Sequence, residues 1–441
     1  MMSYRAYWDQ EIETMDHAEL LSLQEQKLQR QMQYVYDSSP FYREVFDERD
    51  VRPESIRTAS DLRCLPFTRK SDLKSRLEAE PPFSDILCAP VEQAIRMHTS
   101  SGTTGKPTPM FWTRKDLDHW SDMYARAMWS QGARPTDVYQ CSWGFSWFVG
   151  GLGGMQAMER LGALSIPAGS ADAKRQIQSI LDYGVTIISL TPSFALYFGG
   201  VAEEVGVELS EATVRHLICG GEPGANIPGT RQKIEQLWGA KAYDGYGSLE
   251  FQPTAWDCET QSGPHGFEDH VLYEVVDPET YEPVAEGESG VLVLTHLDRE
   301  AMPLVRWWTN DVVRFTTEPC SCGRTHLRLP GGVQSRVDDM LIVKGINVFP
   351  SAVEDVIRTI PGVGEEFRIV VDNEVYDRDT GNVQKLKLLV EQDDPDSEAL
   401  GSRIKKEFRD RMSVSPEVEL VASGTFERST TKTNRLTWDL A

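Results

Sequence analysis

The sequence predicts an α/β protein with a large N-terminal domain of β-sheets layered with helices and a small α+β domain at the C-terminus. Helix-like and strand-like segments alternate from residue 150 to residue 223, and turn-rich strand pairs follow residue 256. A compact set of alternating elements follows residue 338. Such alternation is typical of a parallel sheet covered by helices. We place the domain boundary so that the domains are 1–337 and 338–441.

Two helices are predicted before the alternating region. Apolar residues recur at helical spacing across residues 17–36, Asp16 is a suitable cap, and Pro40 follows the predicted end. Thr113 and Asp116 form a capping-box pattern that begins a second helix.

The alternating region supplies the candidate binding edges. Helix-like patterns cover residues 150–162, 173–184 and the segment from Thr191, and strand-like patterns cover 163–169, 185–190 and 214–223. Ligands of parallel sheets bind at the carboxyl ends of strands, so we expect binding at the loops 220–223 and 244–250.

A second sheet and the small domain complete the chain. Strands are predicted over 270–277 and 290–297, joined by a turn-rich segment, which indicates an antiparallel layer. After the boundary, a strand, a turn and a helix precede strands at 367–372, 385–393 and 418–421 and a helix over 397–412. A set of this size forms one α+β unit.

Composition excludes several classes of protein. The 441 residues are 40% hydrophobic and 26% charged, as in a soluble globular protein. The net charge of −23 disfavours nucleic acid as a partner, because an acidic chain repels polyanions. No membrane span and no signal-peptide core are visible, and seven scattered cysteines do not form a disulfide framework. We therefore expect a cytoplasmic protein.

The stretch HTSSGTTGKPTPM, from His98 to Met110, is rich in glycine and hydroxyl residues. Glycines let the backbone approach a ligand, and hydroxyl and N–H groups donate to its oxygens, which favours a phosphate. The spacing of Gly102 and Gly105 does not fit the P-loop pattern. From composition alone, a Ser/Thr-rich surface turn is an equal alternative.

Four separated segments identify a family. They are SSGTTGKP at residues 100–107, YGSLE at 246–250, TND at 309–311 and SRVDDMLIVKGINVFP at 335–350. In this order and at these distances, the chain resembles the adenylate-forming superfamily of acyl- and aryl-CoA ligases, in its phenylacetate-CoA ligase type. The resemblance implies that a carboxylate attacks the α-phosphate of MgATP to give an acyl-adenylate, and that coenzyme A then takes the acyl group.

The resemblance implies the following ATP- and AMP-binding residues: Ser100, Ser101, Gly102, Thr103, Lys106, Gly221, Glu222, Pro223, Asp244, Tyr246, Gly247, Asp311 and Arg336. Thr104 is expected to reach phosphate or Mg²⁺, and Glu250 resembles the carboxylate that holds Mg²⁺. Asp311 resembles the acid that accepts both ribose hydroxyls. The stretch ERSTTKTNRL places Lys432 at the catalytic position, where its charge offsets that of the developing transition state.

Two positions depart from the family pattern. Thr431 stands where relatives carry glycine before the catalytic lysine, and a solvated tail lysine is the alternative there. Leu249 stands where relatives carry serine or threonine, and Ser248 could supply the missing hydroxyl.

The acid and coenzyme A are assigned to two further stretches. The stretch SWGFSWFVGG is the expected acyl pocket. Its rings can stack on an aromatic acid, and its glycines let the acid approach. The residues assigned to the acid are Trp143, Phe145, Trp147, Phe148 and Gly151. Ordinary core packing is the alternative. In relatives Lys344 and Gly345 line the pantetheine tunnel, and Asp338 is the expected hinge between half-reactions.

Three cysteines and a histidine form a candidate zinc site: Cys258, His265, Cys320 and Cys322. Thiolates and imidazole in this number suit a structural Zn²⁺ ion. Reduced thiols without metal are the alternative, and His270 could replace His265.

The sequence leaves the particular aromatic acid and the oligomeric state open, and a homodimer is compatible with the resemblance. A rival function passes the adenylate to a carrier protein or another nucleophile. A second rival is a ligand-binding homologue without catalysis. Lys344 and Gly345 favour coenzyme A as the acceptor.

Overall fold

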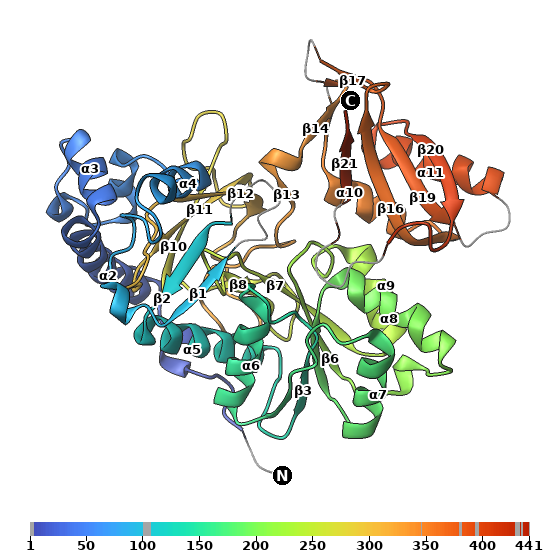
Figure 1. Cartoon of the computed structure of the whole chain (residues 1–441), viewed down its shortest axis with the longest axis horizontal. Coiled ribbons are helices and arrows are strands. Elements are labelled where there is room, and N and C mark those ends of the chain that lie inside the picture. The colour runs from blue at the N-terminus through green and yellow to red at the C-terminus, as the bar shows by residue number, and fades with distance from the viewer. Residues whose placement is uncertain are drawn as a thin grey trace. The chain divides into compact units, whose positions relative to one another are not determined.

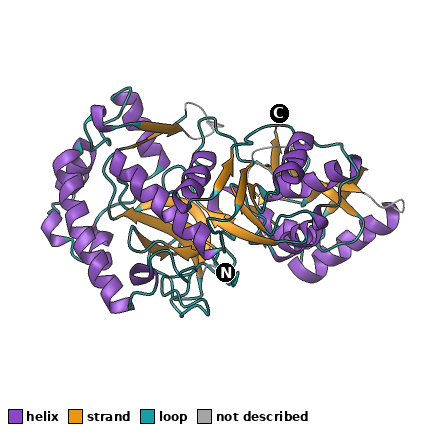
Figure 2. Ribbon diagram, turned by 90° about the horizontal axis from the view of Figure 1, so that it is seen from below, coloured by secondary structure: helices purple, strands orange, loops and turns teal. Residues whose placement is uncertain are grey.

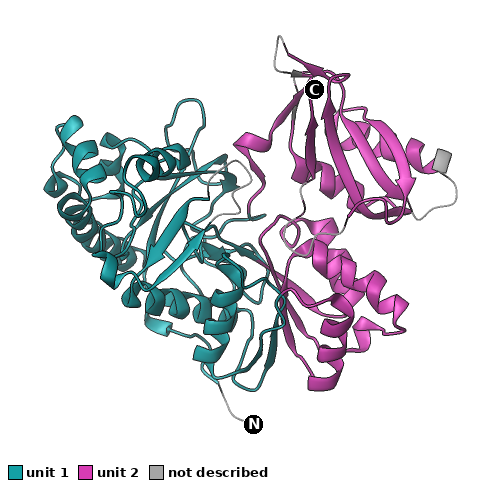
Figure 3. Ribbon diagram, in the orientation of Figure 1, with its two compact units in different colours: residues 1–169, 245–332 teal, residues 170–244, 333–441 magenta. Residues whose placement is uncertain are grey.

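The computed structural model describes residues 4–99, 107–344, 346–378, 382–392, 397–427, 433 and 435–440. The chain forms two compact units, residues 1–169 with 245–332 and residues 170–244 with 333–441 (Figure 3). The chain contains both helices and strands (Figure 2), and each unit has both, so the predicted α/β class is confirmed. Within these ranges, no helix has the length and apolar character needed to cross a membrane. The predicted hinge boundary at residue 338 stays a prediction.

The first unit begins with four helices, drawn in blue in Figure 1: α1 (Gln10–Glu13), α2 (His17–Ser38), α3 (Pro40–Glu48) and α4 (Lys70–Ala79). The predicted helix over 17–36 is confirmed as α2, and the Asp16 carboxylate accepts from the N–H of Ala18 at 2.9 Å. Ser39 ends α2, and its hydroxyl accepts from the N–H of Tyr42. Pro40 therefore begins α3, at a position where its missing N–H costs nothing.

Strands β1 (Arg96–Thr99) and β2 (Pro109–Trp112) pair antiparallel, with Thr99 opposite Pro109. The strand ends on either side of residues 100–106 therefore lie side by side. Helix α5 (Arg114–Ser130) follows β2, and its predicted capping box is confirmed. The Thr113 hydroxyl accepts from the N–H of Asp116 at 3.2 Å, and the Asp116 carboxylate accepts from the N–H of Thr113 at 3.0 Å.

The rest of the first unit contains a β-α-β element and antiparallel strands. Strands β3 (Val138–Cys141) and β4 (Leu164–Ile166) are parallel, with α6 (Gly150–Leu161) between them in sequence. The predicted antiparallel layer is confirmed, in the order β10 (Val271–Val276), β11 (Ser289–His296) and β12 (Trp307–Arg314). Two short strands, β8 (Ala255–Trp256) and β9 (His265–Gly266), pair with each other.

In the second unit, the predicted alternation continues through α7 (Ala173–Tyr183), β5 (Ile187–Leu190), α8 (Pro192–Glu204), β6 (His216–Gly220), α9 (Pro228–Trp238) and β7 (Lys241–Tyr246). Strands β5 and β6 are parallel, and the spatial order is β5-β6-β7. The carboxyl ends of β6 and β7 lead into the stretches 221–223 and 247–250, as predicted, but residues 220 and 244–246 of the predicted loops belong to the strands themselves.

The C-terminal part of the second unit has two four-stranded sheets and two helices. One sheet has the order β15 (Ile346–Val348), β14 (Leu341–Val343), β18 (Asn382–Val383) and β17 (Tyr376–Asp377). The other has the order β20 (Glu417–Ala422), β19 (Lys387–Gln392), β16 (Val363–Asp372) and β21 (Leu436–Asp439). Helices α10 (Pro350–Arg358) and α11 (Ser397–Met412) and the short strand β13 (Ser335–Arg336) complete this part. Its own core includes Val353, Phe367 and Phe408, none of which is exposed, and the predicted α+β unit is confirmed.

Candidate active site

The predicted phosphate-binding residues lie outside the described residues: Ser100, Ser101, Gly102, Thr103, Thr104 and Lys106. The strand that leads to them is described and contains a residue that the sequence did not single out. His98 is buried, and its Nδ1 lies 3.2 Å from the carbonyl oxygen of Trp147. The N–H of Thr99 donates to the same carbonyl at 3.1 Å. The strand before the phosphate loop therefore holds the backbone of the predicted acyl pocket.

The aromatic stretch predicted to bind the acid is partly open to solvent. Trp147 is 65% exposed and Phe148 is 38% exposed, whereas Trp143 and Phe145 are half-buried. A Cβ atom at Gly151 would lie 2.7 Å from the carbonyl oxygen of Gly144 and 3.1 Å from the Phe145 ring. Residues of this chain therefore fill the space above that glycine, which we expected to admit a flat ligand. The acyl-pocket assignment of the exposed rings stays a prediction.

Glu250, the predicted Mg²⁺ ligand, has a buried carboxyl held by its own loop. Burial raises its pKa, against hydrogen bonds from its own N–H and from the Ser248 hydroxyl. The Ser248 hydroxyl also accepts from the N–H of Phe251 at 3.1 Å, and the N–H of Ser248 donates to the Phe251 carbonyl at 2.9 Å. Ser248 is thus engaged within the loop, and its predicted contact with the α-phosphate, in place of Leu249, stays a prediction.

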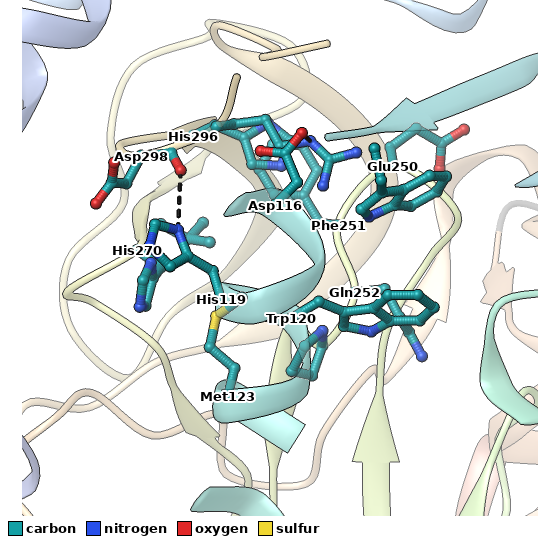
Figure 4. A pocket seen from close by; sticks show the side chains of 14 residues that line it. Asp116, His119, Trp120, Met123, Glu250, Phe251, Gln252, His270, His296 and Asp298 are labelled. Carbon is teal, nitrogen blue, oxygen red and sulfur yellow. Dashed lines mark hydrogen bonds and ion pairs between the residues drawn. The ribbon is translucent and has the colours of Figure 1, made fainter. Parts of the chain in front are cut away.

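A second residue that the sequence did not single out is His296, at the end of β11. Its ring lies parallel to the Phe251 ring, with centroids 3.8 Å apart and an interplanar angle of 8°. His296 and Glu250 line the same pocket, shown in Figure 4. Burial lowers the pKa of His296 well below its usual value, so the ring is neutral. No motif surrounds this lone histidine, and only the structure reveals its neighbours.

Two residues assigned to the nucleotide from distant motifs are in direct contact. The Tyr246 hydroxyl donates to the Asp311 carboxylate at 2.6 Å. The N–H of Asp311 donates to the Thr309 hydroxyl at 2.9 Å, so hydrogen bonds hold both the backbone and the carboxylate of Asp311. At Gly247, a Cβ atom would meet the end of the Gln252 side chain, which would have to move aside.

In the second unit, the Glu222 carboxylate is held by two backbone N–H groups. Those of Ser193 and Thr433 donate to it at 2.8 and 2.6 Å. Burial raises the pKa of Glu222 despite these bonds. Lys432 lies outside the described residues, but its neighbour Thr433 is bound to the predicted adenine motif. No sequence pattern indicates this contact.

The remaining predicted nucleotide residues of this motif occupy a strand end. Gly221 has a φ of +89°, a backbone conformation that favours glycine. Pro223 is exposed, and Asp244 is buried within β7.

The predicted ribose arginine and the predicted hinge residue are paired. Arg336 donates to the Asp338 carboxylate from Nε at 2.9 Å and from Nη2 at 3.1 Å. Lys344 is exposed and has a φ of 49°, and Gly345 lies outside the described residues. The roles of these four residues stay predictions.

The four predicted metal ligands form one cluster. Their ligand atoms lie within 4.8 Å of one another, which brings together Cys258, His265, Cys320 and Cys322. The sulfurs of Cys258 and Cys320 are 3.9 Å apart, and the Cys322 sulfur is 3.6 Å from His265 Nε2. The other ring nitrogen of His265 lies 3.3 Å from the carbonyl oxygen of His326, an arrangement typical of a metal-binding imidazole.

Hydrogen bonds favour the thiolate form at two of the three cysteines, whereas the bond that Cys258 donates to Cys322 raises the pKa of Cys258. The hydrogen bond from Cys258, with a further one from His265, lowers the pKa of Cys322 to about 2. Burial opposes ionisation of Cys320, but hydrogen bonds from His265 and Ser262 lower its pKa to about 6. The thiolate is the form that binds a metal.

His270, the alternative zinc ligand, lies elsewhere. Its Nε2 is 3.4 Å from the Asp269 carboxylate, and its ring packs against His119 at 4.9 Å between centroids. These two histidines and Asp298 are close enough for a metal ion. However, the Asp298 carboxylate already pairs with Lys27 at 3.3 Å and with Lys115 at 3.0 Å, so we assign no metal there.

Comparison with known proteins identifies the family. The model of an AMP-binding enzyme matches residues 10–296, and that of an AMP-binding enzyme C-terminal domain matches residues 345–439. The chain belongs to the AMP-binding enzymes. The predicted family, fold and enzyme class, an AMP-forming acid–thiol ligase, are confirmed.

Two curated AMP-binding enzymes are similar over most of their length. A phenylacetate-coenzyme A ligase of Thermus thermophilus is 37% identical, over 95% of this chain and 96% of that protein. A phenylacetate-coenzyme A ligase of Escherichia coli K12 is 36% identical, over 86% of this chain and 84% of that protein.

Solved structures of a 2-hydroxyisobutyryl-CoA ligase are similar along the whole chain. In its postadenylation state with 2-HIB-AMP, that ligase matches with a TM-score of 0.94 and 30% identity, over 100% of this chain and 94% of its own. In its thioesterification state with 2-HIB-AMP and CoA, the TM-score is 0.75 and the identity 31%, over 99% and 93%.

Proposed function

We propose that this AMP-binding enzyme joins an aromatic or arylacetic acid, with phenylacetate as the model substrate, to coenzyme A through an acyl-adenylate. Curated phenylacetate-coenzyme A ligases are 33–37% identical to it. The contact of Tyr246 with Asp311 carries the proposal, because it joins two nucleotide motifs in one place. Asp311 accepts a hydrogen bond from Tyr246, and a carboxylate is an acceptor of the kind that ribose hydroxyls need.

Glu250 is the proposed Mg²⁺ ligand. Its carboxyl is buried, and both burial and the charge of Asp311 raise its pKa, so a cation would favour its ionised form. Carboxylate oxygen also suits a hard ion. When bound, Mg²⁺ supplies positive charge to the phosphates of ATP. Glu250 fixes the place of that charge, and Thr104 is its proposed companion.

Lys432 is the proposed catalyst of adenylation. The bond from its neighbour Thr433 to Glu222 supports this role, because Glu222 belongs to the proposed adenine pocket. Gly345 would admit pantetheine in the second half-reaction, with a movement about Asp338 between the two. The two states of 2-hydroxyisobutyryl-CoA ligase support such a movement.

Zinc is the proposed structural metal of the cysteine cluster. Two Zn–S bonds of about 2.3 Å at a tetrahedral angle place the sulfurs about 3.8 Å apart, and a sulfur and a nitrogen about 3.6 Å apart. The distances of 3.9 Å and 3.6 Å in this chain fit those values. With four protein ligands, such an ion has no open position for a substrate.

The acid is proposed to bind at the exposed aromatic rings, and the particular acid is left open. ATP–pyrophosphate exchange with a panel of aromatic and aliphatic acids tests the adenylation, and thioester formation with added coenzyme A tests the acceptor. Exchange that needs an aromatic acid, followed by thioester, supports the proposal. Exchange without thioester indicates another acceptor, and no exchange with any acid indicates a ligand-binding homologue.

We also propose the cellular compartment of the enzyme and the class of its partners. None of the seven cysteines forms a disulfide bond, which supports a reducing compartment such as the cytoplasm. The acidic charge of −23 supports the absence of a nucleic-acid partner. A homodimer stays a prediction that light scattering tests.

A further inference from the structure

His296 contacts the proposed Mg²⁺-binding loop from behind. It ends β11, is only 8% exposed, and lies face to face with Phe251 at 3.8 Å. Figure 4 shows His296, Phe251 and Glu250 around the same pocket. Phe251 is the residue directly after Glu250, so the His296 ring stacks on the side chain next to the one that carries the carboxylate.

Hydrogen bonds fix the orientation of this ring. The N–H of Leu304 donates to His296 Nδ1 at 3.0 Å, so Nδ1 is an acceptor. In a neutral imidazole the proton then lies on Nε2, which becomes the donor. The remaining hydrogen bond of the ring is with the backbone of Glu250, where a carbonyl oxygen accepts it. His296 thus links the backbone at Leu304 to the backbone at Glu250.

The carboxylate itself is held by a residue of its own loop. The Ser248 hydroxyl accepts from the N–H of Phe251 at 3.1 Å and donates its own proton to the Glu250 carboxylate. Ser248 therefore orients the carboxylate, and His296 places the backbone from which it extends. A partner behind a metal ligand typically changes metal affinity about 10- to 100-fold when it is removed.

We propose that His296 is a positioning residue for the Glu250 carboxylate, and that it strengthens the binding of the divalent cation that accompanies ATP. This inference rests on the proposed function of Glu250. The ring stack limits how far the loop can rotate, and the hydrogen bond limits how far the Glu250 backbone can move away from β11. Both contacts come from a strand of the antiparallel layer, which is more rigid than the loop it supports.

The experiment compares three variants by a measurement other than turnover. Mn²⁺ replaces Mg²⁺, since both prefer six oxygen ligands, and its binding with a non-hydrolysable ATP analogue is followed by electron paramagnetic resonance. His296→Phe keeps a ring and removes both hydrogen bonds, and His296→Gln restores an N–H donor. Val293→Ala is the matched control, because Val293 is fully buried on the opposite face of the same strand.

We expect the Mn²⁺ dissociation constant to rise at least about 10-fold in His296→Phe and to recover to within about 3-fold in His296→Gln. Val293→Ala should be less stable, with unchanged affinity. Equal affinity in His296→Phe and the wild type overturns the inference, as does an equal loss in Val293→Ala. If His296→Phe does not fold, His296→Leu replaces it with the same expectations.

A further variant separates this inference from the proposed function. Glu250→Gln should lose Mn²⁺ affinity if the carboxylate is a ligand. Wild-type affinity in Glu250→Gln overturns the proposed role of Glu250 and this inference with it. A loss in Glu250→Gln together with wild-type affinity in His296→Phe overturns the inference alone.

Discussion

Replacing Cys320 by serine tests the proposed zinc site and its structural purpose together. The variant removes one of four ligands, and we expect the zinc content to fall from about one equivalent per chain to a small fraction of that. The ligand loop also binds the N-terminal segment. The Tyr7 hydroxyl donates to the Cys322 carbonyl at 3.0 Å, and Arg324 Nε donates to the Glu13 carboxylate at 2.6 Å.

These contacts determine how much folding free energy Cys320→Ser should lose. The N–H of Thr325 also donates to the carbonyl of Glu13 at 3.1 Å. A net contribution of about 1 kcal/mol for each neutral hydrogen bond and about 2 kcal/mol for the charged one gives a loss of about 3–5 kcal/mol. For a unit of this size, such a loss lowers the melting temperature by about 5–10 °C.

Metal analysis, thermal unfolding and hydrogen exchange of residues 7–15 measure the three consequences. Cys88→Ser is the matched control, because Cys88 is a buried cysteine of the same unit outside the cluster. Zinc retained by Cys320→Ser, or an equal loss in Cys88→Ser, refutes the ligand assignment. Unchanged exchange of residues 7–15 in zinc-free protein refutes the structural argument.

Four other predictions follow from the site. Lys432→Ala should abolish pyrophosphate exchange yet still convert supplied acyl-adenylate and coenzyme A to thioester, and equal impairment of both half-reactions contradicts its role. Tyr246→Phe removes the donor to Asp311 and should raise the KM for ATP about 10-fold, with little change in the KM for the acid. Trp147→Ala should weaken binding of aromatic acids and spare ATP, measured by calorimetry, and the reverse pattern contradicts the acyl assignment. Burial raises the pKa of Glu268 from 4.5 to about 7, so the folded state holds its proton more tightly than the unfolded state. The stability of the wild type should therefore fall by up to about 3 kcal/mol as the pH rises from 4.5 to 7, whereas Glu268→Gln should lack this slope in urea unfolding.

The sequence predicted most elements because their patterns are local. The helix over 17–36, the capping box at Thr113 and the alternation after residue 150 depend on neighbours within a few turns. Strand β12 was not predicted as a strand, although it carries Asp311. Its buried tryptophans and single polar acid do not alternate clearly enough to show a strand.

The site was predicted unevenly, because motifs show residue types and not contacts. The cysteine cluster and the meeting of Tyr246 with Asp311 agree with what their motifs indicated. His98 and His296 were not identified, since each is a single histidine outside any motif. The role of His98 depends on Trp147, which is 49 residues away in sequence. The role of His296 depends on Leu304, which is 8 residues away, and on the Phe251 ring. The glycine at 151 was interpreted as space for a ligand, whereas Phe145 of the same chain occupies it.

The bond between Thr433 and Glu222 is made by a backbone N–H group, and every residue except proline has one. Its formation is therefore independent of which side chains stand at positions 431 and 433. Mutations that change these side chains can accumulate while the chain still returns to the same anchor beside the adenine motif. The threonine at position 431, where the family pattern predicts a glycine, therefore does not remove this anchor.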